Sequence, residues 1–318
     1  MITPFFVLFG LMAIGYLCAK RNWLDATKNE GLGNIMVYVA LPSLILSSMI
    51  ATELYGQVLI NFVMMTALSV SFFFLCGLMA KVYIKLARVP GRLASMVELS
   101  MLSSNNGFMG FPVTIAYFGQ QGLILMVANN LAMGIVVWSY GLYILKKTKR
   151  RYEDEEHSEK DSILQSLKLM LNPTILAVLA GIVICLTRIN SHIPEPLVQL
   201  LSVMGGLATP LSMIYIGVTL CGSSILSLFR KPLVMGPSII RLTLFSAVIF
   251  TIVSLLPLYS LMKQMLFLVA VLPSAAIVPA MAGKYSYGAE EASQIVAMST
   301  VLSVVCTPLG VFLALTFL

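Results

Sequence analysis

The chain has 318 residues, of which 59% are hydrophobic and only 10% charged, and its mean hydropathy is +0.95. Soluble proteins carry about 25% charged residues, so the composition excludes an ordinary soluble domain and predicts an all-α polytopic membrane protein in the lipid bilayer. The formal net charge of +7 does not indicate a nucleic-acid partner, because the basic residues are concentrated in particular loops.

Ten apolar runs are long enough to cross a bilayer, which takes about 17 to 25 residues. The first is interpreted as a retained span and not as a signal peptide, because its positive charges follow the apolar run. The predicted spans are 3–19, 33–51, 58–80, 93–118, 122–145, 170–187, 197–221, 233–256, 264–283 and 291–316.

The loop charges predict the orientation of these spans. Seventeen of the 20 Lys and Arg residues fall in loops one, three, five, seven and nine, whereas the other loops contain only Arg188 and Lys263. Cytoplasmic loops carry the excess of Lys and Arg. We therefore expect a multi-pass protein of the plasma (inner) membrane with both termini extracytoplasmic.

The spacing of prolines predicts an internal repeat. Five spans per copy is an odd number, so the second copy enters the membrane in the opposite direction, as in many secondary transporters. The sequence thus predicts a first repeat over 1–146, a charged cytoplasmic linker over 147–168 and a second, inverted repeat over 169–318. The offset is 169, 168 and 167 residues for Pro4 and Pro173, Pro42 and Pro210, and Pro112 and Pro279.

The stretch SSNNGFMGFP (103–112) interrupts the fourth predicted span with two amides, two glycines and a proline. At the repeat offset its counterpart is LPSAAIVPA (272–280) in the ninth, with Asn105 and Asn106 opposite Pro273 and Ser274. Non-helical backbone at membrane depth is tolerated only where it is buried in protein or lines a wet cavity. We therefore expect helices four and nine to be broken, and their ends to form a binding site.

Two charged residues fall clearly within predicted spans, Glu98 and Arg241. Intramembrane charges mark binding sites or ion pathways by default. Arg241 could serve as the counter-charge of an anionic substrate, form a structural pair with Glu98, or extend toward the inner surface. Glu98 could carry a coupling proton, although a structural pair is the safer interpretation. Of the adjacent amides Asn129 and Asn130, one is expected to face the cavity or the broken helix, since neighbours on a helix point in different directions.

An enzyme is not expected. The two histidines, His157 and His192, lie in loops, and the chain has no HExxH, GxGD or GxSxG pattern and no glycine-rich phosphate loop. An intramembrane hydrolase would need a nucleophile with a base, a carboxylate pair or a metal cluster. No metal site and no cofactor are therefore predicted.

Several motifs resemble the auxin efflux carrier family, in the bacterial branch that includes malate and malonate permeases. They are VYVALPSLIL in span two, NNGFMGFPV in span four, LPSAAIVPAMAGKYSYG in span nine and STVLSVVCTPLG in span ten, in matching order along the chain. The resemblance implies ten spans in two inverted repeats with crossed broken helices four and nine, a fold shared with sodium/proton antiporters. It also implies a scaffold of spans 1, 2, 6 and 7, often a homodimer interface, and a transport domain of spans 3–5 and 8–10.

The resemblance also implies carboxylate substrates, which are auxin in plants and small dicarboxylates in bacteria. It places Asn105, Asn106 and Pro112 at the first crossover and Pro273 and Ser274 at the second. In one departure, the chain has Ala275-Ala276-Ile277-Val278 where many relatives have an asparagine, which leaves fewer polar groups there.

We therefore predict a carrier of small organic anions that works by alternating access, elevator-type or rocking, with a proton or sodium as the candidate coupling ion. The alternatives are a carrier of a neutral or sterol-like solute and a membrane sensor or scaffold without transport. The predicted substrate-binding residues are Asn105, Asn106, Gly107, Pro112, Pro273, Ser274, Asn130 and Arg241, with Glu98 as the candidate for coupling.

Overall fold

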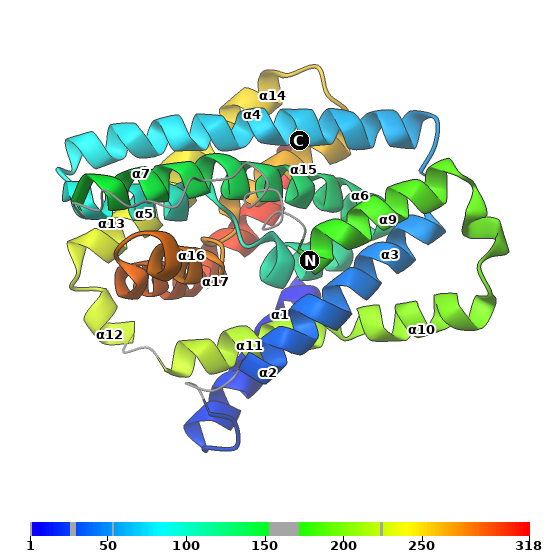
Figure 1. Cartoon of the computed structure of the whole chain (residues 1–318), viewed down its shortest axis with the longest axis horizontal. Coiled ribbons are helices and arrows are strands. Elements are labelled where there is room, and N and C mark those ends of the chain that lie inside the picture. Colours follow the sequence, from blue (N-terminus) through cyan, green and yellow to red (C-terminus); the bar gives the residue numbers. More distant parts are fainter. Residues whose placement is uncertain (1, 26–29, 53, 153–171, 223–224) are drawn as a thin grey trace. The chain divides into compact units, whose positions relative to one another are not determined.

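The computed structural model of the chain describes residues 2–25, 30–52, 54–152, 172–222 and 225–318. Apart from one isolated β-bridge, every secondary-structure element in these ranges is a helix (Figure 1). The predicted all-α class is therefore confirmed. Residues 153–168 of the predicted charged linker lie outside the described ranges.

Seven helical stretches in the described residues are long and apolar enough to cross a membrane, and Pro173–Leu186 and Ser260–Val271 are shorter apolar helices. The predicted count of ten spans is thus not confirmed. The longest stretch, Asn106–Tyr152, is not one straight rod, because Gly119 has φ 59° and ψ −155° within it. The chain changes direction there, between the fourth and fifth predicted spans.

The chain forms two compact units that interleave along the sequence. Unit 1 comprises Met1–Ala67, Asn106–Leu131 and Leu171–Ser223, and unit 2 comprises Leu68–Asn105, Ala132–Met170 and Ser224–Leu318. The chain passes from unit 2 to unit 1 between Asn105 and Asn106. Each compact unit contains segments from both halves of the sequence, whereas each predicted repeat is one half of it. The division into units therefore does not test the predicted repeat boundaries, which stay a prediction.

In unit 1, α1 packs along α11, and α3 packs between α9 and α10, with α3 beside α9 in Figure 1. Gly15 and Gly217 allow the close approach of α1 to α11, because a Cβ on either would overlap backbone atoms of the other helix. The elements of this unit are α1 (Ile2–Lys20), α2 (Glu30–Ile35), the π-helix η1 (Met36–Ala40), α3 (Leu41–Ala51), the start of α4 (Gln57–Leu86), the π-helix η2 (Asn106–Gly110), most of α6 (Phe111–Val136), α9 (Pro173–Leu186), the short 3₁₀ helix η4 (Ile189–His192), α10 (Glu195–Gly206) and α11 (Ala208–Cys221).

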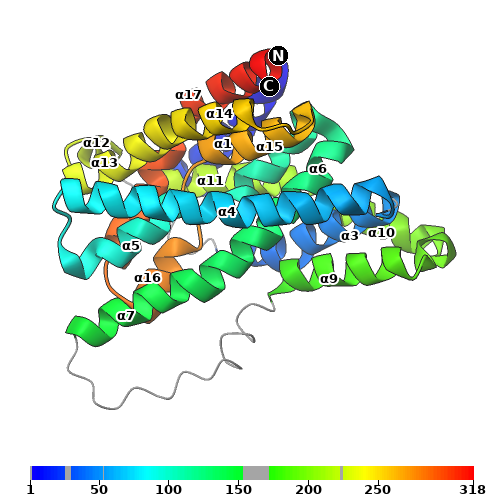
Figure 2. The same cartoon turned by 90° about the horizontal axis from the view of Figure 1, so that it is seen from above.

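In unit 2, α17 contacts α13, α15 and α16, and α14 runs alongside α15 (Figure 2). Helix α5 contacts α7, α13, α16 and α17. The elements of this unit are the rest of α4, α5 (Gly91–Leu102), the end of α6, the π-helix η3 (Val137–Gly141), α7 (Leu142–Tyr152), α12 (Ile225–Leu228), α13 (Pro232–Ile240), the π-helix η5 (Arg241–Phe245), α14 (Ser246–Leu255), α15 (Ser260–Val271), α16 (Val278–Tyr285) and α17 (Ala289–Phe317).

Candidate functional site

The first predicted break lies at residues 103–105. Helix α5 ends at Leu102, and Ser103 is extended with φ −91° and ψ 144°. Helical structure resumes at Asn106, so Gly107 lies inside η2 and Pro112 is the second residue of α6. Because η2 runs directly into α6, Pro112 is the seventh residue of the second half-helix, and its missing N–H removes one main-chain donor where the π-helical turn meets α6. The interruption is where the sequence predicted it, but the glycine and proline lie within the second half-helix instead of ending the first.

The second predicted break lies at residues 272–277. Helix α15 ends at Val271, and Leu272 is extended with φ −77° and ψ 151°. The next helix, α16, starts at Val278 with a proline in its first turn. Each of the two segments that the repeat offset matched is therefore a pair of short helices joined by extended backbone.

The extended residues of the two breaks pair with each other inside unit 2. Ser104 and Ser274 form an isolated antiparallel bridge. The Asn105 N–H donates to the Pro273 carbonyl at 2.9 Å. Asn105 is 3% exposed and both serines are fully buried. The structure thus brings together Asn105, Pro273 and Ser274 of the predicted site, and it pairs Asn105 with the residue that stood opposite at the repeat offset.

Arg241, the first residue of η5, holds the carbonyl ends of both broken helices. Its Nη2 donates to the Ser103 carbonyl at 2.9 Å, at the end of α5, and its Nη1 donates to the Ala270 carbonyl at 3.3 Å, at the end of α15. A helix C-terminus carries about half a negative charge, so two such ends together offset about one positive charge. This explains how a side chain that is 3% exposed stays buried as a cation.

The expected structural pair between Arg241 and Glu98 is wrong. The donors of Arg241 go to backbone carbonyls, whereas the ion-pair partner of Glu98 is Lys81. The sequence could not indicate this arrangement, because every residue type presents the same backbone carbonyl.

Hydroxyl groups from neighbouring helices complete the bonding of the second break. Ser246 Oγ donates to the Ala270 carbonyl at 3.0 Å, and Thr307 Oγ1 donates to the Val271 carbonyl at 2.9 Å. The Ser274 N–H donates to Ser299 Oγ at 3.1 Å. By contrast, Ser274 Oγ and Arg241 Nε are buried without a hydrogen-bond partner. Buried polar atoms are normally bonded, so these two atoms call for an explanation, of which a ligand is one.

In unit 1, the predicted residue Asn106 bonds to the neighbouring span. Its Nδ2 donates to Asn129 Oδ1 at 2.7 Å, and both amides are fully buried. The sequence left open which of Asn129 and Asn130 faces the broken helix; it is Asn129. Asn130, the residue chosen as a substrate ligand, is 8% exposed and takes no part in this bond.

Gly107 and Phe108 fix η2 within unit 1. A Cβ at Gly107 would lie 3.3 Å from Leu41 Cδ1, so a larger residue would press on α3. The Phe108 ring stacks on Tyr215 of α11, with centroids 5.0 Å apart and an interplanar angle of 28°. Gly107 is thus a packing position in this structure.

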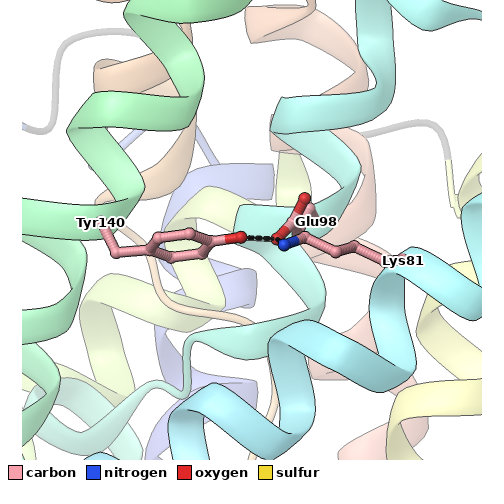
Figure 3. A network of polar contacts seen from close by, with 3 residues as sticks. All are labelled: Lys81, Glu98 and Tyr140. Carbon is pink, nitrogen blue, oxygen red and sulfur yellow. Dashed lines mark hydrogen bonds and ion pairs between the residues drawn. The ribbon is translucent and has the colours of Figure 1, made fainter.

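Glu98 belongs to a second polar group in unit 2, drawn in Figure 3. It is 7% exposed and accepts a short hydrogen bond from the Tyr140 hydroxyl of η3. The Lys81 ammonium of α4 lies 3.8 Å from Glu98 Oε1 and 5.3 Å from the centre of the Tyr140 ring. We call Lys81, Glu98 and Tyr140 the carboxylate network.

Sequence reasoning missed Lys81, Tyr140 and Ser299 as contributors. Lys81 was counted as a loop residue because the third span was predicted to end at residue 80, but α4 continues to Leu86. Asn106, Tyr140 and Arg241 each lie in a π-helical turn. Such turns often mark functional sites, but no composition signal identifies them in a sequence.

Comparison with known proteins gives consistent results. The sequence profile of a family described as "membrane transport protein" matches residues 1–311. The chain is similar to an uncharacterized transporter of Methanothermobacter thermautotrophicus, with 25% identity over 300 residues that cover 94% of this chain and 93% of the relative. It is also similar to an uncharacterized transporter of Methanocaldococcus jannaschii, with 26% identity over 281 residues, or 83% of each chain.

A third similarity is to the lysosomal cholesterol signaling protein of Mus musculus. The identity is 25% over 224 residues, which cover 67% of this chain and 25% of the mouse protein. The similarity therefore concerns only a part of that larger protein.

Proposed function

Because the chain belongs to the membrane transport protein family, the auxin efflux carriers, we propose that it carries small organic anions across the membrane. The observation that carries the proposal is the pairing of the two chain breaks. Both lie at interruptions of apolar helices, and they meet through the buried residues Ser104 and Ser274. Carriers bind their substrates at such discontinuous helices.

The meeting of sequence-matched residues also supports an inverted repeat. In an assembly with two-fold symmetry, residues on the axis meet their own counterparts. Asn105 and Pro273, matched at an offset of 168, are bonded in this way. We propose ten spans in two inverted repeats with the crossed helices four and nine, as the family resemblance implied, and an elevator-type or rocking transport cycle.

The chemistry of the second break favours an anion. Helix α16 begins there, and a helix N-terminus presents unpaired N–H groups and about half a positive charge. The Ser274 hydroxyl can donate another hydrogen bond, and Arg241, whose charge the two helix ends offset, has an unbonded Nε–H that can donate one more. Among the described residues no acidic side chain falls between Leu272 and Ile277. Carboxylates of the malate, malonate or indole-acetate type fit these donors.

Ser274 provides the sharpest test, because its hydroxyl makes no bond that folding requires. Ser274→Ala should leave thermal stability intact but remove one hydrogen bond to the substrate. Such a bond is worth about 0.5–1.5 kcal/mol, so KM should rise about 2- to 12-fold. The matched control is Ser95→Ala on α5, whose hydroxyl is also buried and unbonded but lies outside the breaks.

The measurement is uptake of radiolabelled malate, malonate and indole-3-acetate into proteoliposomes that contain the parent or either variant. The proposal expects at least one acid to enter above the level of protein-free vesicles, with KM raised only by Ser274→Ala. Absence of uptake of all three acids, or an equal KM in both variants and the parent, would contradict it.

A sterol-like ligand is the second candidate, and the similarity to the mouse cholesterol signaling protein favours it. The two candidates differ in ligand chemistry, because a sterol would not use the anion-binding donors of the breaks. A thermal-shift comparison of cholesterol with the same three acids separates them. Stabilisation by cholesterol alone, unchanged in Ser274→Ala, would favour the second candidate.

A further inference from the structure

We propose that Glu98 is a proton-binding site and that its protonation couples organic-anion transport to a proton gradient. The inference rests on the proposed function and adds the coupling ion to it. The only buried charged side chains in the described residues are Glu98 and Arg241, and Arg241 is already engaged by the two helix ends. Ionisable groups inside membrane segments are expensive to bury and mark ion pathways by default.

The carboxylate network joins this buried group to the surface of the protein. Glu98 is 7% exposed, whereas the Lys81 side chain, 3.8 Å away, is 56% exposed. Tyr140 donates its hydroxyl to the same oxygen, Glu98 Oε1, that faces Lys81. Figure 3 shows the ammonium and the hydroxyl converging on one edge of the carboxylate. In this proposal the proton therefore enters on the Lys81 side of Glu98, where the network reaches the surface of the protein.

The surroundings leave the second carboxylate oxygen available. The polar contacts of Glu98 in the described structure, those with Tyr140 and Lys81, both involve Oε1. Gly77 of α4 also faces Oε1, where an added Cβ would lie 3.8 Å away. Helices α7, α13, α16 and α17 also pack against α5, and in their described parts none brings another cation within ion-pair distance of Glu98. Oε2 can therefore hold the proton while Oε1 keeps both contacts.

The position of Glu98 links proton binding to the substrate. Glu98 lies on α5, four residues before the helix ends at Leu102 and the first break begins. With Glu98 ionised, its charge balances that of Lys81. With Glu98 protonated, the short helix that ends at the break loses its negative charge and the charge of Lys81 on α4 is no longer balanced, so the net charge of unit 2 rises by one. The anion and the proton then bind together. A dianion that crosses the membrane with one proton carries a net charge of −1 instead of −2.

The test separates exchange from accumulation. In proteoliposomes with equal pH on both sides, counterflow of radiolabelled malate, malonate and indole-3-acetate needs no gradient. With valinomycin and potassium holding the membrane potential at zero, a pH step that is alkaline inside drives accumulation above that of protein-free vesicles only in a proton-coupled carrier. The protein-free vesicles are subtracted because a permeant weak acid such as indole-3-acetic acid is trapped in an alkaline lumen without any protein. The parent is expected to accumulate at least one acid above equilibrium.

Glu98→Gln mimics the protonated carboxyl. It should keep counterflow within about twofold of the parent and lose accumulation above equilibrium. The matched control Glu290→Gln changes an exposed glutamate of the same unit, bonded to Gln294, and should accumulate like the parent. Accumulation by Glu98→Gln at the parental level, or loss of its counterflow in folded protein, would overturn the inference.

The parent alone distinguishes this inference from the function on which it rests. Counterflow without any pH-driven accumulation overturns proton coupling and leaves the carrier proposal standing. Absence of counterflow for all three acids overturns both. If Glu98→Gln does not fold, Tyr140→Phe is the second variant. It keeps the carboxyl but removes the hydroxyl, and it should shift the pH dependence of pH-driven uptake while leaving counterflow in place; an unchanged pH dependence would count against the inference.

Discussion

Glu98 and Arg241 show two ways in which this chain keeps a charged side chain buried within apolar segments. Arg241 is held by backbone carbonyls at the ends of α5 and α15, where the helix dipoles supply the opposing charge. Glu98 is held by a tyrosine hydroxyl and a half-exposed lysine. The first arrangement has its charge offset by fixed backbone, which suits a structural role. The second contains a carboxylate that can change its protonation state.

Arg241 is expected to stabilise the paired breaks. Arg241→Ala should lower the free energy of unfolding by about 1–3 kcal/mol, because the buried Ser103 carbonyl loses its charged donor. Arg241→Lys should recover part of this, since an ammonium restores the charge but lacks the planar fork that reaches both carbonyls. Thermal unfolding in detergent measures both, with the exposed Arg230→Ala as control. If Arg241→Ala unfolds at the parental temperature, the role assigned to Arg241 is wrong.

The buried amide pair of unit 1 makes a second prediction at this scale. Asn106→Ala and Asn129→Ala should each destabilise the protein by about 1–3 kcal/mol, because each removes the buried bond between the two amides. The double variant should lose less than the sum, with a coupling of about 0.5–1.5 kcal/mol. Thermal unfolding of the four proteins gives this coupling. If the losses of stability in the two single variants add up to that of the double variant, the 2.7 Å bond between Asn106 and Asn129 does not stabilise the protein.

At the scale of elements, the breaks were predictable because their sequences contain residues that disfavour a continuous helix. Adjacent asparagines, glycines and prolines in a long apolar run left few alternatives. The position of the break within 103–112 was not predictable, because a proline in a membrane helix does not by itself say where the helix is interrupted: Pro112 lies inside the second half-helix, which begins at Asn106. The π-helical turns that contain Asn106, Tyr140 and Arg241 were also missed, since an extra residue per turn depends on tertiary packing and not on residue type.

Gly119 interrupts α6 and separates the fourth predicted span from the fifth. Its φ of 59° with ψ of −155° belongs to a region that only glycine occupies readily. Gly119→Ala should therefore destabilise the protein by about 1–3 kcal/mol, although a Cβ there would meet no atom within 4 Å. The control Gly10→Ala, in the interior of α1 with equally open space, should be neutral or stabilising. Equal unfolding temperatures for the two variants would contradict this account of the turn.

At the scale of the molecule, composition and motif order sufficed for the family, because apolar length and a few interrupted spans are written in the sequence. The contact partners in the site were less accessible. Lys81 was assigned to a loop, and a pair with Glu98 was one of the alternatives for Arg241, because sequence distance does not say which helices touch. The boundaries between the two compact units fall within α4, directly after the first break and within α6. No change in composition marks these points.

The predicted orientation can be tested with single cysteines. In a variant without the five native cysteines, Glu195→Cys and Lys147→Cys place exposed thiols at the start of α10 and in α7. The positive-inside distribution predicts that an impermeant maleimide labels Glu195→Cys in intact cells, and labels Lys147→Cys only after permeabilisation. The reverse pattern would place both termini in the cytoplasm.

The central claim is that the protein exchanges small organic anions at the paired breaks. Counterflow of radiolabelled malate, malonate and indole-3-acetate in proteoliposomes tests it most directly, with Asn106→Ala compared to Asn61→Ala, the same change at an amide bonded to Gln57 on α4. We predict exchange of at least one acid by the parent and by Asn61→Ala, and a reduction of about tenfold or more in Asn106→Ala, which loses a buried bond beside the break. Equal exchange in all three proteins, or none in the parent, would contradict the claim.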